Sequence, residues 1–108
     1  MGEYQTIKLS VEARTAIITI DNPPANAFNT QQMLDLEAVF NEVTHDEQVK
    51  VIIITGAGQF FIAGADIKEM AGIAPDEAYE IIRKGQLVFT QIEHSKKPVI
   101  AAINGRYC

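Results

Sequence analysis

The sequence is poor in the residues that build disulfide frameworks, metal sites and membrane spans. Its single cysteine, Cys108, allows neither an internal disulfide nor a metal site with several cysteine ligands. No apolar run approaches the roughly 18 residues of a transmembrane helix, and the N-terminal residues lack the basic and apolar regions of a signal peptide. We therefore expect a protein of the reducing cytoplasm, with no membrane and no metal among its partners.

Positive charge is also scarce. The chain has 9 Lys and Arg against 14 Asp and Glu, a net charge of −5. Proteins that bind nucleic acids typically present a basic surface, so this balance argues against a nucleic-acid partner. It does not exclude an anionic ligand held by a local group of residues. The 108 residues, 47% of them hydrophobic and 21% charged, are typical of one globular domain without an internal boundary.

Side chains suited to acid–base or nucleophilic catalysis are few. Neither Ser10 nor Ser95 lies in a nucleophile-elbow motif. His45 and His94 each follow a predicted helix in polar surroundings, which is typical of solvated residues. A solvated helix face accounts for several carboxylates, among them Glu77, Glu80 and Glu93. The sequence thus offers no convincing general acid or base.

The first half of the chain predicts a β-hairpin followed by a helix. Residues 7–11 alternate apolar and polar side chains, and residues 15–21 form a second β-rich run a short distance further on. Two prolines then stiffen the loop that follows, since each lacks a backbone donor. Asn29 with Gln32 three residues later resembles a capping box, which predicts a helix over about 30–45.

The second half predicts a parallel β-α-β unit, and with it an α/β fold. Residues 51–54 are a continuous β-branched run, typical of a parallel strand covered on both faces. Residues 99–103 form a similar apolar strand. Two helices are expected between them: a short one capped by Asp66 and ended by Gly72, and a longer one that begins at Pro75. A crossover of this length joins parallel strands.

The small residues after the strand at 51–54 are the candidate binding segment. A dinucleotide motif starting at Gly56 fails because its third glycine would fall at Phe61. Residues 63–68 allow two interpretations. They form either a tight loop with a helix cap, or a loop that lets a ligand approach the backbone and points the N–H of Ala65 at a developing oxyanion.

Three segments together resemble one family. Residues 22–28 (NPPANAF), 54–70 (ITGAGQFFIAGADIKEM) and 97–105 (KPVIAAING) are similar in content, order and spacing to the enoyl-CoA hydratase/isomerase, or crotonase, superfamily. The resemblance implies the crotonase-like ββα spiral, of which residues 1–108 would form an N-terminal part. Family members are usually more than twice this length, and the family's catalytic glutamates map beyond Gly105.

The resemblance implies an enoyl-CoA hydratase that hydrates 2-enoyl-CoA thioesters, as in fatty-acid β-oxidation. Its partner would be an acyl-CoA thioester, with coenzyme A as part of the substrate and no separate cofactor. The backbone N–H of Ala65 would be one donor of the oxyanion hole. The resemblance places the CoA-binding residues at Ala25, Ala27, Ala63, Gly64, Ala65, Asp66, Ile67 and Lys68.

Two alternatives stay open at this point. The protein could catalyse another reaction of the same superfamily, such as enoyl-CoA isomerisation, or the chain could be a truncated, non-catalytic module of crotonase type. The family commonly forms trimers and hexamers. The apolar strands at 51–54 and 99–103 would also leave an apolar patch on the isolated chain. We therefore expect a homo-oligomer, or marginal stability if the chain is alone.

Overall fold

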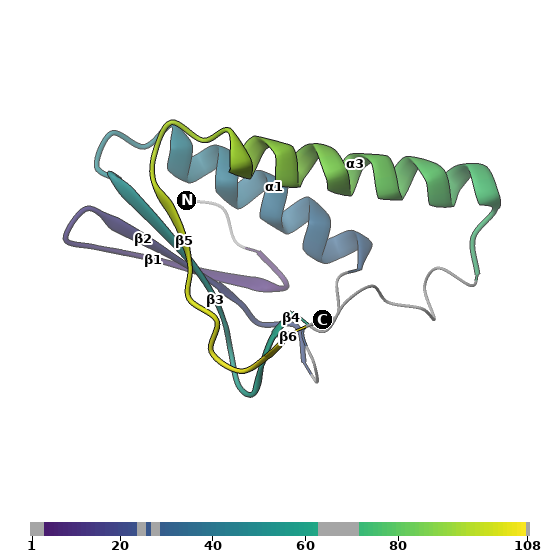
Figure 1. Cartoon of the computed structure of the whole chain (residues 1–108), viewed down its shortest axis with the longest axis horizontal. Helices are drawn as coiled ribbons and strands as arrows, with labels where there is room; N and C mark the ends of the chain where they lie inside the picture. The colour runs from purple at the N-terminus through teal and green to yellow at the C-terminus, as the bar shows by residue number, and fades with distance from the viewer. Residues whose placement is uncertain (1–3, 24–25, 27–28, 63–71, 108) are drawn as a thin grey trace.

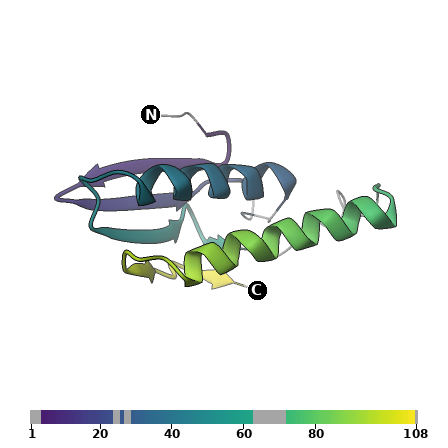
Figure 2. The same ribbon diagram turned by 90° about the horizontal axis from the view of Figure 1, so that it is seen from above.

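The computed structural model describes residues 4–23, 26, 29–62 and 72–107. Its main body is a four-stranded sheet in the order β1-β2-β3-β5, with the helices α1 and α3 packed on one face (Figures 1 and 2). The core fills the space between this face and the helices, and it is formed by Ile7, Ala16, Ile18, Ile20, Met33, Leu36, Val39, Phe40, Val43, Val49, Ile52, Ile54 and Val88. The predicted α/β class is confirmed.

Strands β1 (Ile7–Glu12) and β2 (Thr15–Ile20) form the predicted antiparallel hairpin. The two residues between them, Ala13 and Arg14, have φ values of 48° and 65°. Two consecutive residues with positive φ are typical of the type I′ turn, whose twist matches that of the flanking strands. The turn lacks the usual Asn-Gly or Asp-Gly pair, so two side chains are held in a conformation that glycine adopts more easily.

Helix α1 (Thr30–Thr44) confirms the predicted helix and half of its capping box. The Asn29 side chain accepts a hydrogen bond from the backbone N–H of Gln32 at 2.8 Å. At the other end of the helix, Lys97 Nζ donates to the carbonyl oxygens of Val43 and Asp46, each at 2.7 Å. A lysine at this position satisfies carbonyl groups that the helix itself leaves unpaired.

Strand β3 (Val51–Gly56) lies parallel to β5 (Val99–Ala101), as predicted, and on its other side it lies parallel to β2, a pairing that was not predicted. Strand β3 was expected to be covered on both faces, but in the structure only one face is covered. Its helix side is buried, but on the other side Ile53 pairs in register with Ile17 and with Ile100, which is 52% exposed. The continuous apolar run suggested cover on both faces, whereas the helices described here lie on one face only.

Helix α3 (Pro75–Glu93) begins at the proline that the sequence indicated, with Asp76 and Glu77 in its first turn. Gly85 and Val88 are its buried residues, and the helix packs beside α1. The short helix predicted from Asp66 lies outside the described residues. In the part of the chain that the structure describes, no helix combines the length and apolar character needed to span a bilayer.

A second, smaller sheet was not predicted. Strand β4 (Phe60–Ile62) pairs in parallel with β6 (Arg106–Tyr107). The chain reaches β4 from β3 and β6 from β5, so two neighbouring parallel strands leave the main sheet and continue side by side (Figure 1). This is why β5 ends at residue 101, two residues before the end of the predicted strand.

Candidate functional site

The carboxyl ends of β2, β3 and β5 lie at one edge of the sheet because these strands are parallel. The three segments that carry the family resemblance follow these three ends: residues 22–28 after β2, the segment from residue 57 after β3, and residues 102–105 after β5. In open α/β sheets, ligands typically bind outside the carboxyl ends of the strands. This carboxyl edge is therefore the candidate site.

The residues predicted to bind CoA lie outside the described part of the chain. These are Ala25, Ala27, Ala63, Gly64, Ala65, Asp66, Ile67 and Lys68. Their roles, including that of the Ala65 N–H, stay predictions. The structure does define the residues that flank them on the three strands, and these form a connected set of hydrogen bonds.

Asn26 links the loop after β2 to the segment after β3. Its side chain is almost fully buried, and its φ of 56° lies in the left-handed region that asparagine tolerates better than most residues. Its Oδ1 accepts the N–H of Asn22 at 2.7 Å, while its Nδ2 donates to the carbonyl oxygens of Ala57 at 3.2 Å and Phe61 at 3.5 Å. One side chain thus joins two of the three segments.

Asn104 links the segment after β5 to the same stretch. Its Oδ1 accepts the N–H of Gly56 at 3.0 Å, and its Nδ2 donates to the carbonyl oxygen of Gly58 at 2.9 Å. Close by, Thr55 Oγ1 donates to the carbonyl oxygen of Ala102 at 2.8 Å. Asn26 and Asn104 belong to the family segments, but no role was predicted for their side chains. The signal available was an asparagine beside small residues a few positions after a β-strand.

Two glycines at this edge are needed for different reasons. Gly58 has a φ of 74°, and a Cβ there would meet nothing within 4 Å, so its requirement is conformational. A Cβ at Gly105 would lie 2.2 Å from the backbone carbonyl oxygen of Gln59, so its requirement is space. Gly105 thus allows residues 102–105 to lie against residues 56–59, while Gly58 allows the backbone conformation of the bend itself.

The described residues at the carboxyl edge supply amides and backbone groups. An ion pair between Lys8 Nζ and Asp21, at 3.0 Å, borders the end of β2. Among the residues that the structure describes, no group of three or more His, Cys, Asp or Glu could hold a metal ion.

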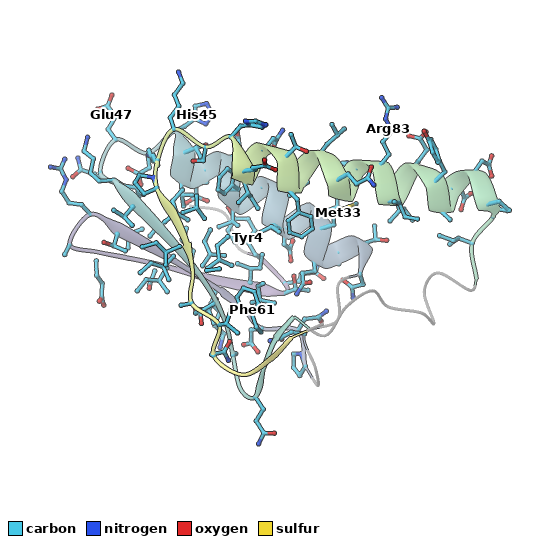
Figure 3. All side chains as sticks on the ribbon, in the orientation of Figure 1. Tyr4, Met33, His45, Glu47, Phe61 and Arg83 are labelled. Atoms are coloured by element: carbon cyan, nitrogen blue, oxygen red, sulfur yellow. The ribbon has the colours of Figure 1, made fainter. Side chains whose placement is uncertain are left out.

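Two cavities flank the sheet. A mostly apolar cavity of about 460 Å³ is lined by Ile20, Ile54, Phe61, Phe89, Val99 and Ala101, among others, and so reaches the carboxyl ends of all three parallel strands. A larger cavity of about 660 Å³ lies at the opposite edge, lined by residues that include His45 and Glu47. Figure 3 shows Phe61 near the carboxyl edge, and His45 and Glu47 at the other end of the sheet. The larger cavity contains none of the residues at the carboxyl edge.

Comparison with known proteins gives one family. The family model for enoyl-CoA hydratase/isomerase matches residues 10–108. The crotonyl-CoA hydratase of Syntrophomonas wolfei is 42% identical over 104 residues, which cover 94% of this chain and 40% of the relative. The short-chain-enoyl-CoA hydratase of Clostridium acetobutylicum is 39% identical over 105 residues, covering 95% and 40%.

Comparison with solved structures indicates the same family. The crystal structure of an enoyl-CoA hydratase from Bacillus anthracis superposes with a TM-score of 0.87 at 29% identity, covering 94% of this chain and 40% of that one. The chain spans about 40% of the length of the curated relatives it matches. By the matched model and by the shared crotonase fold, the chain belongs to the enoyl-CoA hydratase/isomerase family.

Proposed function

We propose that the protein is an enoyl-CoA hydratase that adds water across the double bond of a 2-enoyl-CoA thioester in fatty-acid breakdown. The observation that carries this proposal is that the described parts of the three family segments meet at the carboxyl edge of the parallel strands, where Asn26 and Asn104 join them. Identity of 39% and 42% to proteins named as hydratases supports the choice of reaction.

In this proposal the chain supplies one oxyanion donor and part of the CoA site. The N–H of Ala65 holds the thioester carbonyl oxygen as negative charge develops on it, which in related chemistry is worth about 3 kcal/mol. Ala25, Ala27 and residues 63–68 line the CoA site, and coenzyme A enters as part of the substrate. In this proposal the general acid and base are the glutamates that the family places beyond Gly105. They must lie within hydrogen-bond reach of the attacking water and of the carbon that is protonated.

The test uses the product of the complete gene and crotonyl-CoA, with loss of enoyl-thioester absorbance as the readout. Only proline removes a backbone N–H, so Ala65→Pro should lower kcat by roughly 100-fold or more. Ala65→Gly keeps the N–H and serves as the matched control, with kcat close to that of the parent. Migration of the double bond without hydration would indicate the isomerase instead. Turnover by the 108-residue chain alone would contradict the placement of the acid and base.

We also propose a cytoplasmic homo-oligomer, a trimer or hexamer. The row formed by Ile17, Ile53 and Ile100 on the face of the sheet away from α1 and α3 supports association, because Ile100 is half exposed. Sedimentation velocity of the parent and of Ile100→Ser tests this. A parent that stays monomeric and unfolds cooperatively at low concentration would contradict it.

A further inference from the structure

The bend at residues 56–59, which leads from β3 into β4, is held from two sides by asparagine side chains. On one side, Asn26 Nδ2 donates to the carbonyl oxygen of Ala57. On the other side, Asn104 Nδ2 donates to the carbonyl oxygen of Gly58 and Asn104 Oδ1 accepts the N–H of Gly56. The two asparagines come from segments 31 residues before and 46 residues after their partners in the bend.

Beyond the end of the β3–β5 pairing, a side-chain hydrogen bond replaces the backbone hydrogen bonds between the two strands. The N–H of Ala102 still donates to the carbonyl oxygen of Ile54 at 2.8 Å, as a continuation of the β3–β5 pairing. Further along, the N–H of Gly56 donates to the side chain of Asn104 at 3.0 Å. The amide of Asn104 therefore acts as a ladder partner that lets both strands turn together into the second sheet.

Burial makes this connection rigid on the side of Asn26. Asn26 is 3% exposed, and its Oδ1 and Nδ2 both bond to backbone groups of other residues. A buried amide with satisfied donors and acceptors fixes its neighbours, because breaking any bond leaves a polar group unpaired in a low-dielectric interior. On the side of Asn104, the backbone of Gly105 packs directly against the Gln59 carbonyl oxygen. No side chain fits between the two segments at this point.

We propose that Asn26 and Asn104 are positioning residues for the acyl-CoA site, because they fix where β4 leaves the main sheet. The inference rests on the proposed function, since the segment with the Ala65 donor follows β4 directly in the sequence. Neither asparagine touches the substrate in this proposal. Displacing a positioned group by about 1 Å can cost roughly 100-fold in rate, so a modest shift of the bend is sufficient for a measurable effect.

The test measures the Kd of free coenzyme A and the urea midpoint of the complete protein. Asn104→Ala removes both hydrogen bonds to the bend, while Asn26→Asp keeps the acceptor and the tolerance of positive φ but cannot donate to Ala57. Each should raise the Kd by about tenfold, because the backbone groups that contact coenzyme A would be displaced. Val43→Ala is the control, because Val43 is a buried core residue in the last turn of α1, next to Thr44 and His45, which line the cavity at the opposite edge of the sheet. It should lower the urea midpoint while leaving the Kd within about twofold of the parent.

The outcomes separate the inference from the proposed function. A parent that binds no coenzyme A and hydrates no crotonyl-CoA would overturn both. A parent that binds, together with asparagine variants that bind equally well, would overturn the positioning role alone. So would a rise in Kd for Val43→Ala equal to that for Asn104→Ala. If Asn104→Ala does not fold, Asn104→Asp replaces it: this variant keeps the acceptor for Gly56 and loses the donor to Gly58, and the same rise in Kd is expected.

Discussion

The backbone of Gly105 lies so close to the carbonyl oxygen of Gln59 that a Cβ atom at Gly105 would be 2.2 Å from it. The obstacle is a backbone atom, so no side-chain rotation relieves it. Gly105→Ala should therefore lower the free energy of unfolding by about 1–3 kcal/mol, measured by urea denaturation.

Gly58 provides a matched comparison for Gly105. A Cβ there meets nothing within 4 Å, but φ is 74°. Gly58→Ala should cost about 1 kcal/mol, and Gly58→Asn less, because asparagine tolerates the left-handed region. Gly105→Asn should be no better than Gly105→Ala. If the asparagine variant were more stable than the alanine variant at both positions, position 105 would require a particular backbone conformation and not space.

Gln32 is fully buried, and neither its Oε1 nor its Nε2 has a hydrogen-bond partner among the described residues. Burying an unpaired amide costs about 1–3 kcal/mol in proteins. Gln32→Leu, of similar volume, should therefore raise the free energy of unfolding by about 1 kcal/mol or more.

The neighbouring glutamine is the control for this substitution. Gln31 Nε2 donates to Asp35 Oδ1 at 2.8 Å, so Gln31→Leu removes a hydrogen bond and should lower stability or leave it unchanged. Both variants are compared by thermal and urea unfolding at one pH. A loss of stability for Gln32→Leu, larger than that for Gln31→Leu, would contradict the prediction.

Lys97 caps α1 through two short hydrogen bonds from its Nζ to the carbonyl oxygens of Val43 and Asp46. Hydrogen bonds to a charged group are worth about 1.5–3 kcal/mol, so Lys97→Met should lower the free energy of unfolding by at least 1 kcal/mol. The exposed neighbour Lys96 provides the control, and Lys96→Met should change it by less than about 0.5 kcal/mol. Equal effects of the two substitutions would argue for a loss of net charge instead of a lost cap.

Tyr4 makes stability depend on pH in the alkaline range. Burial raises the pKa of Tyr4 to about 12, and the hydrogen bond that its hydroxyl donates to Glu42 and the charges of Glu42 and Asp35 add to the rise. An unfolded tyrosine titrates near pH 10. The folded state thus holds the proton more tightly, and this contribution is complete below pH 10 and lost as the pH rises from about 10 to 12.

The measurement for Tyr4 compares the parent with Tyr4→Phe. The parent should lose stability over this alkaline range more steeply than the variant, and near-ultraviolet absorbance should show one high-pH phenol transition that the variant lacks. Equal pH slopes for the two proteins would indicate that Tyr4 is ionised as readily in the folded chain as in the unfolded one.

Local patterns predicted the elements whose partners are close in the sequence or whose period is regular. Alternation predicted the hairpin, Asn29 predicted the start of α1, and Pro75 predicted the start of α3. The parallel pairing of β3 with β5 followed from the length of the crossover. These features depend on backbone preferences and burial periodicity, which are readable from one sequence.

What escaped prediction depends on contacts between distant segments. The strand predicted over residues 99–103 ends at Ala101, because the chain there turns so that β6 pairs with the distant β4. Gln32 resembles the second member of a capping box, yet its side chain finds no partner among the described residues. The motif shows which residue types are present, while tertiary packing decides which of their hydrogen bonds form.

The β3–β5 pairing also has a consequence for the order of folding. The Thr55–Ala102 and Gly56–Asn104 hydrogen bonds join residues 47 and 48 positions apart in the sequence. In the β1–β2 hairpin, by contrast, only two residues lie between the paired strands. Long loops cost more chain entropy to close, so the hairpin should form early and the bend at 56–59 late. Substitutions at Asn104 should then mainly accelerate unfolding, with little change in the refolding rate. The carboxyl edge would be the last part of the described fold to assemble and the first to open.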